Sequence, residues 1–178
     1  MEKVAAESRK VEVKKEFIKA LLVLPGNVLV VIPALILWTT GDGAYALDPG
    51  IPRHWRFCAT VGCTTVGLVL TVWTCREFLI TGMGTPAPWA PPKKLVVRGP
   101  YRHVRNPMIS GVLFLLGAEA LFFGSRPLAG WLALFFLANA IYLPLFEEKG
   151  LERRFGSDYA RYKASVPRWL PRLTPWRV

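Results

Sequence analysis

Apolar residues fill four long blocks of the sequence, and polar or proline-rich segments separate them. The blocks cover residues 17–40, 55–80, 108–124 and 128–146. A helix needs about 20 mainly apolar residues to cross the ~30 Å hydrocarbon core of a bilayer. The pattern therefore predicts an all-α, polytopic membrane protein with about four transmembrane helices, of which the last two are short.

The segments outside these blocks are charged or rich in proline. Residues 1–16 mix lysine, arginine and glutamate with spaced apolar side chains, which predicts an amphipathic helix lying on the membrane surface. Residues 81–107 contain too many prolines for a helix and form a long connection. Residues 147–178 are charged, and we expect a helix there as far as about residue 164. Together these segments form one expected domain, 1–178.

The distribution of basic residues predicts the orientation in the membrane. The chain has 23 Lys and Arg residues and a formal net charge of +11. Only Arg53, Arg56 and Arg126 fall on one side of the expected helices. Cytosolic segments carry the excess of basic residues, so we expect both termini and the connection 81–107 to be cytosolic. The expected location is the inner membrane of a bacterium or archaeon, or the endoplasmic reticulum of a eukaryote.

Composition excludes several other classes. With 52% hydrophobic residues, the chain is too apolar for an ordinary soluble basic protein. Its basic residues flank apolar blocks instead of covering a soluble face, so nucleic acid is not an expected partner. The three cysteines have no ligand-type spacing, and we expect neither a metal site nor a disulfide. Nothing in the sequence indicates an oligomeric state.

The most distinctive stretch is the basic, proline-punctuated segment 98–111, here called the motif segment. It reads Arg-Gly-Pro-Tyr-Arg-His-Val-Arg-Asn-Pro-Met-Ile-Ser-Gly. Pro107 suits the first position of the helix that follows. A helix N-terminus beside arginines favours a carboxylate or phosphate ligand. The alternative is an ordinary cytosolic loop whose arginines only obey the charge rule for membrane proteins.

Two polar side chains are expected near the middle of the membrane. Glu119 lies about 11 residues into the third helix, and Asn139 lies about 11 residues into the fourth. An intramembrane carboxylate is costly and is by default a functional candidate. The alternative is a protonated Glu119 that bonds Asn139 or a backbone carbonyl and holds the helices together.

A second group of charges begins where the fourth helix leaves the membrane. Glu147 and Glu148 are adjacent there, and several arginines follow in the tail. Paired carboxylates opposite Arg102 or Arg105 would bind a zwitterion such as an α-amino acid moiety. The alternative is that these charges pair with one another, as most interfacial clusters do.

Two spaced motifs carry a family resemblance. They are Gly-Pro-Tyr-Arg-x-x-Arg-Asn-Pro-x-x-x-Gly at residues 99–111 and Glu-Glu-x-x-Leu-x-x-x-Phe-Gly-x-x-Tyr-x-x-Tyr-x-x-x-Val-Pro-Arg-x-x-Pro at residues 147–171. In this order they resemble the isoprenylcysteine carboxyl methyltransferase and phospholipid methyltransferase superfamily of integral membrane enzymes. The matching residues are Tyr101, Arg102, His103, Arg105, Asn106, Pro107, Gly111, Glu147, Glu148, Tyr159, Tyr162 and Arg168.

The resemblance implies methyl transfer from S-adenosylmethionine, bound on the cytosolic side by the residues just named. It also implies an acceptor from the bilayer, either a phospholipid head-group amine or an isoprenylcysteine-type carboxylate. Three departures concern the ligand pockets, because the family often has histidine at Asn106, an aromatic residue at Ile109 and proline at Lys149. The N-terminal half matches no pattern, although it is expected to shape the acceptor pocket.

The chemistry of this reaction fits the residues. Displacement at a sulfonium methyl needs no metal, only a lone pair held about 3–3.5 Å from the methyl. A carboxylate or thiolate acceptor needs no base, whereas an amine must first lose a proton to a group such as Glu147 or His103. We take Glu119, Glu148 and Arg105 as the candidate catalytic residues.

Other functions remain open on the sequence alone. No Gly-x-Gly-x-x-Gly follows a strand pattern, which excludes a soluble Rossmann-type methyltransferase. A small-thiol methyltransferase uses the same chemistry. The NADPH-dependent membrane sterol reductases have a similar C-terminal end, although the Arg-Asn-Pro motif favours the methyltransferases. A non-enzymatic membrane binding protein is the third alternative.

Overall fold

The computed structural model describes residues 25–41, 53–77 and 95–177, together with Lys15, Lys19, Val23 and Ile80. Every regular element in that part of the chain is helical, which confirms the predicted all-α class. Apart from the single residues just named, the predicted surface helix 1–16, residues 17–24 and the connections 42–52 and 81–94 lie outside the described residues.

The described helices follow the four apolar blocks and the tail. In order they are η1 (Asn27–Val31), α2 (Ile32–Thr40), α3 (Arg53–Glu77), η3 (Gly99–Arg102), α4 (Pro107–Phe123), α5 (Arg126–Tyr142), η4 (Leu143–Glu147) and α6 (Glu148–Ser165). Two stretches are long and apolar enough to cross a membrane, His54–Glu77 and Arg126–Ser165. Two shorter apolar helices, Asn27–Thr40 and Pro107–Phe123, complete the set.

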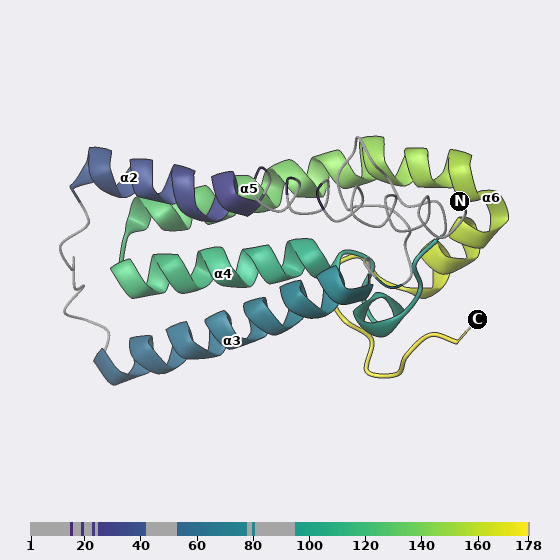
Figure 1. Ribbon diagram of the computed structural model, residues 1–178, viewed down its shortest axis with the longest axis horizontal. Coiled ribbons are helices and arrows are strands. Elements are labelled where there is room, and N and C mark those ends of the chain that lie inside the picture. Colours follow the sequence, from purple (N-terminus) through teal and green to yellow (C-terminus); the bar gives the residue numbers. More distant parts are fainter. Residues whose placement is uncertain are drawn as a thin grey trace, which may run out of the picture.

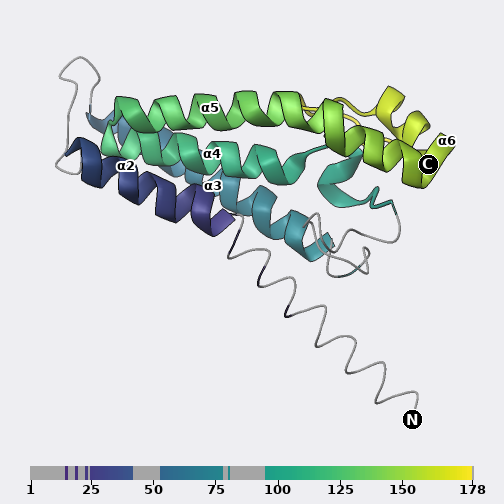
Figure 2. The ribbon, with the colours of Figure 1, turned by 90° about the horizontal axis from the view of Figure 1, so that it is seen from above.

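The four apolar helices run side by side as an elongated bundle (Figure 1). Helix α4 lies in the middle and packs against α3 and α5, and α2 packs against α5 (Figure 2). Large apolar side chains such as Trp38, Val72 and Phe146 are exposed on the outside of the bundle. A soluble protein rarely exposes such a continuous apolar surface. The arrangement is that of helices surrounded by lipid.

Glycine allows α3 and α4 to approach closely. A Cβ atom on Gly67 of α3 would lie 2.9 Å from the carbonyl oxygen of Gly111 in α4 and 2.7 Å from Cγ of Leu115. A Cβ on Gly111 would lie 2.7 Å from Oγ1 of Thr71. Small residues at such contacts are the usual means of helix association in membranes. They hold the C-terminal half of α3 against the start of α4.

Proline explains the irregular start of the first helix. Residues 27–31 form a π-helix, in which each N–H bonds to the carbonyl five residues earlier. Pro33 has no N–H, so the carbonyl of Val28 lacks its partner in that register. Trp131 of α5 supplies one instead, because its Nε1 donates to the Val28 oxygen at 3.1 Å. The bond attaches the first helix to α5.

Helix α6 contains a sharp kink at a glycine of the second motif. Gly156 has φ 53° and ψ −127°, a conformation that L side chains rarely adopt. The chain turns there, so the second half of α6 comes back towards the bundle. Tyr159, Tyr162 and Val166 are buried in a small core that also includes Leu95, Val97, Leu151, Phe155 and Trp176. This core joins the tail to the segment that precedes α4.

We predict opposite effects for two glycine substitutions within α3. In a helix interior alanine is favoured over glycine by about 1 kcal/mol. Gly62→Ala should gain this stability, because a Cβ there meets nothing within 4 Å. Gly67→Ala should lose about 1–3 kcal/mol, because its Cβ would press on the backbone of α4. Unfolding of both variants in detergent micelles measures the difference, and equal shifts would contradict the proposed close contact.

Candidate active site

The C-terminal tail lies along the motif segment and is hydrogen-bonded to its backbone. Three N–H···O bonds of 2.9 Å join them, from Arg105 to Pro167, from Arg172 to His103 and from Trp176 to Arg102. The Tyr162 hydroxyl also donates to the Tyr101 carbonyl at 2.8 Å. The two sequence motifs therefore form one site at the end of the bundle where α3 ends and α4 begins (Figure 1).

Glu148 is the centre of this site. It is 3% exposed, and its Oε1 accepts hydrogen bonds from Arg105 Nη1 at 2.9 Å and from Arg168 Nε at 2.8 Å. The Lys163 ammonium forms an ion pair with Oε2 at 3.2 Å. The three cations come from the motif segment, the tail and the second half of α6. One carboxylate thus links three segments.

The charges around Glu148 keep it ionised. Burial by itself would raise the pKa of this carboxyl group. The hydrogen bond from Arg168, the charge of Arg105 and the hydrogen bond from Lys163 outweigh burial and lower the pKa below its ordinary value. Glu148 is therefore a fixed negative charge at neutral pH, and it is unsuited to carry a proton as a general base.

Two side chains of the motif segment are oriented by tail carbonyls. Arg102 Nε donates to the Trp176 oxygen at 2.7 Å. His103 Nδ1 lies 2.7 Å from the Arg172 oxygen. Because a carbonyl only accepts, Nδ1 carries the hydrogen, and Nε2 of a neutral imidazole is left as an acceptor. His103 thus has the tautomer that a proton acceptor at Nε2 requires.

Tyrosines form the inner wall of the site. Burial is the main cause that raises the pKa of Tyr101 well above its ordinary value, and Tyr162, Glu147 and Cys75 add to the effect. Tyr101 therefore stays a neutral phenol throughout the physiological pH range. The rings of Tyr159 and Tyr162 lie 6.1 Å apart, and that of Trp176 lies 5.7 Å from Tyr162.

Two buried polar atoms at the centre have unused bonding capacity. Among the described residues, Arg105 Nε has no hydrogen-bond acceptor, and Glu148 Oε2 has the Lys163 ammonium beside it at 3.2 Å with room for a further donor. Unsatisfied buried groups of this kind are costly in a folded protein unless a ligand completes them. A donor and an acceptor side by side are the complement of an α-amino acid's carboxylate and ammonium.

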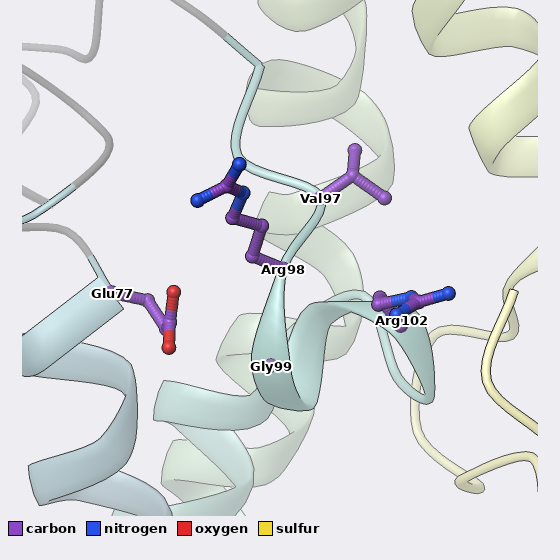
Figure 3. Close-up of a pocket in the computed structure, with 5 residues that line it drawn as sticks. All are labelled: Glu77, Val97, Arg98, Gly99 and Arg102. Carbon is purple, nitrogen blue, oxygen red and sulfur yellow. The ribbon is translucent and has the colours of Figure 1, made fainter. Parts of the chain in front are cut away.

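A separate pocket of about 420 Å³ lies beside η3 (Figure 3). Glu77 at the end of α3 lines it together with Val97, Arg98, Gly99 and Arg102. Gly99 has φ +53°, and a Cβ there would lie 2.7 Å from Nε1 of Trp73. The turn can therefore lie against α3 only because position 99 is glycine.

The comparison with protein families gives a match over much of the chain. Residues 55–158 match the family model described as phospholipid methyltransferase. The chain belongs to this family. The match begins in α3 and ends in α6. It therefore covers the first motif completely, the second motif as far as residue 158, and also the helix that lines the pocket beside η3. The comparisons with curated proteins and with solved structures found no match.

Membership of the phospholipid methyltransferase family indicates a membrane methyltransferase. It also agrees with the apolar helices, which identify an integral membrane protein. The family match extends further towards the N-terminus than the two motifs do. It reaches α3, for which the sequence analysis found no pattern.

The remaining site residues occupy several positions. Pro107 begins α4, as predicted, and Asn106 precedes it with its carbonyl bonded to Ser110 N at 3.0 Å. Gly111 faces α3 instead of the cluster around Glu148. Glu147 is an exposed residue in η4 and forms no ion pair with another described residue.

The structure does not bring Glu119 to the other candidate residues. It lies 12 residues beyond Pro107 in α4, which places it about 18 Å along the helix from the motif segment. Asn139 is not its hydrogen-bond partner either. The Asn139 Nδ2 donates instead to the Phe135 oxygen of its own helix at 2.8 Å. The Oε2 atom of Glu119 is buried without a hydrogen-bond partner among the described residues.

Lys163 was missed by the sequence reasoning. In a straight helix it would lie about 22 Å from Glu148, yet the two form an ion pair because of the kink at Gly156. The glycine in the Phe-Gly pair was the available signal. Glu77 and Trp176 were missed as well, since each is distant in sequence from the segment that it contacts.

We predict that the ionised Glu148 stabilises the fold at neutral pH. Glu148→Gln removes one partner of a buried cluster, which costs about 3–5 kcal/mol. Since the folded pKa is lowered, this contribution is present above the ordinary pKa of 4.5 and is lost as the pH falls below it. The stability gap between wild type and variant should thus be full at pH 7 and shrink at pH 3.

Thermal unfolding in detergent across that pH range measures the gap. Asp158→Asn serves as the control, because its ion pair with Arg161 is exposed and should contribute little. A gap for Glu148→Gln no larger than that of the control would contradict the central role of this carboxylate.

Proposed function

We propose that the protein transfers a methyl group from S-adenosylmethionine to an acceptor that enters from the bilayer. The acceptor is a phospholipid head-group amine or an isoprenylcysteine-type carboxylate. Family membership gives the reaction class, and one structural observation supports the cofactor site. Between the two motifs, Arg105 Nε is buried without an acceptor among the described residues, close to the carboxylate of Glu148, whose Oε2 is paired with Lys163 alone.

The residues of this site fit the amino acid end of the cofactor. Arg105 would hold its carboxylate and Glu148 its ammonium, with Tyr101, Tyr159 and Tyr162 as apolar walls. Arg102, His103 and Arg168 support the site through their bonds to the tail and to Glu148. When bound, S-adenosylmethionine supplies a methyl group on a positively charged sulfur, and no metal is needed for its transfer.

The chain contributes by positioning and by excluding water. The backbone bonds between tail and motif segment keep the site closed on its cytosolic side. In a site with little water, charge interactions are stronger than in solution. For an amine acceptor, His103 Nε2 and the exposed Glu147 are the available proton acceptors. Glu119 is too distant along α4 for proton transfer at this site, since a base must lie within hydrogen-bond reach.

The proposed topology has four spans with both termini in the cytosol. The basic residues of the motif segment and the tail lie together at one end of the bundle, which supports a common cytosolic location. Arg56, near the opposite end of α3, donates to the Leu121 oxygen close to the C-terminus of α4. Arg56, one of the few basic residues at that end, thus joins α3 to α4.

Cofactor binding is the first test. We expect the detergent-purified protein to bind S-adenosylmethionine and S-adenosylhomocysteine, and not NADPH, in a calorimetric titration. Arg105→Lys keeps the positive charge beside Glu148 but removes the unsatisfied Nε, so affinity for both adenosyl compounds should fall about tenfold or more.

Arg153→Lys is the matched control. This exposed arginine of α6 forms no ion pair with another described residue, so the variant should bind as wild type does. Binding of NADPH alone would indicate that the protein is a reductase and not a methyltransferase. Binding of none of the three compounds would favour a non-enzymatic role. An unchanged affinity in Arg105→Lys would refute the assignment of this arginine.

A further inference from the structure

Two leucines of the C-terminal tail are exposed although they lie outside the apolar helices. Leu170 is 80% exposed and Leu173 is 99% exposed, the two highest values among the large apolar side chains of the described residues. All the other exposed side chains of this kind belong to the four apolar blocks. A single exposed leucine is normal on a protein surface. Two of them beside Trp169 form an apolar patch, here called the tail tip (residues 169–173).

The tail tip packs against a membrane helix. The ring of Trp169 lies on that of Phe136 in α5, with the ring centres 5.3 Å apart. Phe136 is itself exposed on the outside of the bundle, and it lies six residues before Tyr142, the end of α5, which is about 9 Å along the helix. Figure 1 shows the tail turning back as far as the end of α3 and the start of α4. The Trp169 ring thus reaches the level of the apolar helices.

Hydrogen bonds on both sides fix the position of the tail tip. Before it, the Pro167 carbonyl accepts from Arg105 N at 2.9 Å, and within it Arg172 N donates to the His103 carbonyl at 2.9 Å. Arg172 Nη1 also donates to the Ser165 carbonyl at 2.7 Å. The exposed leucines are therefore presented by a short loop that is attached to the motif segment, and they do not belong to a loose chain end.

The bilayer is the partner that fits the tail tip. Through the contact between Trp169 and Phe136, the apolar surface of the tip continues the outer surface of α5, which faces lipid. The neighbouring residues are also those of a membrane interface. Tryptophan and arginine are commonly placed there, and Arg172, Trp176 and Arg177 lie in or directly after the tip. Insertion would remove both leucines from water, which is favourable.

We propose that the tail tip inserts into the bilayer leaflet on the side of the motif segment and thereby holds the tail in place. The carbonyls of Arg172 and Trp176 orient His103 and Arg102, so the order of these side chains depends on the seated tail. The inference goes beyond the proposed function, because it concerns the surface on which the tail lies and does not depend on the reaction. Part of the tail then belongs to the membrane interface, not to the cytosol.

A fluorescent label at position 170 tests the insertion, with the full chain in phosphatidylcholine nanodiscs. Leu170→Cys is made in a chain whose three cysteines are replaced by alanine, and it is labelled with bimane. Interfacial segments insert about 5–10 Å deep, so a nitroxide near the top of the acyl chains should quench roughly half or more of the fluorescence. Ser157→Cys, at an exposed position of α6, is the matched control and should be quenched little.

Trypsin gives a second measurement on the chain with its native cysteines. The peptide bond after Arg172 lies within the tail tip, so the bilayer should protect it. Leu170→Glu should speed this cleavage about tenfold or more, because a carboxylate is excluded from lipid. Leu170→Ile keeps the apolar surface and should be cleaved as slowly as wild type.

Three results would overturn the inference. The first is a label at position 170 that is quenched no more than the label at position 157. The second is a label with blue-shifted emission that nitroxide lipids do not quench, because a protein surface would then cover the tail tip. The third is equal cleavage after Arg172 in wild type and Leu170→Glu.

Discussion

The site depends on one buried negative charge. Glu148 lies at the point where the last membrane helix becomes the tail, and it has little contact with water. Removing a carboxylate from water costs several kcal/mol unless cations compensate for it. Here Arg105, Arg168 and Lys163 supply that compensation from three separate segments. Because each cation must reach the same carboxylate, the motif segment, the tail and α6 can close in only one arrangement.

The kink at Gly156 and the prolines of the tail make this arrangement possible. Without a residue that tolerates positive φ, α6 would continue straight and carry Lys163 away from Glu148. After the helix, the tail runs without regular secondary structure along the motif segment, where its carbonyls accept from Arg102 and His103. The backbone kink thus brings the charged residues together, and the ion pairs of Glu148 then stabilise the closed site.

The sequence predicted the helices better than the contacts between them. Apolar blocks give helix positions directly, because their length and hydropathy depend on local composition. The meeting of the two motifs was inferred from the positive charge that they share, and the structure brings them together through the bonds between residues 102–105 and 167–176. The sequence could not show which group faces Glu119, because this depends on how each helix is rotated about its axis. In the structure the Asn139 amide donates to a carbonyl oxygen of its own helix. The tight contact at Gly67 depends on the same rotation.

Paired and separated charges distinguish the two sides of the η3 turn. Opposite charges in contact, as around Glu148, stabilise the fold and leave only single atoms for a ligand. Opposite charges held apart, as at Glu77 and Arg98, form no ion pair within the described part of the chain and contribute less to stability (Figure 3). Gly99 maintains this separation, because a side chain there would collide with Trp73 and move Arg98 away from α3. The η3 turn thus lies between a cluster of paired charges and a pocket lined by separated ones.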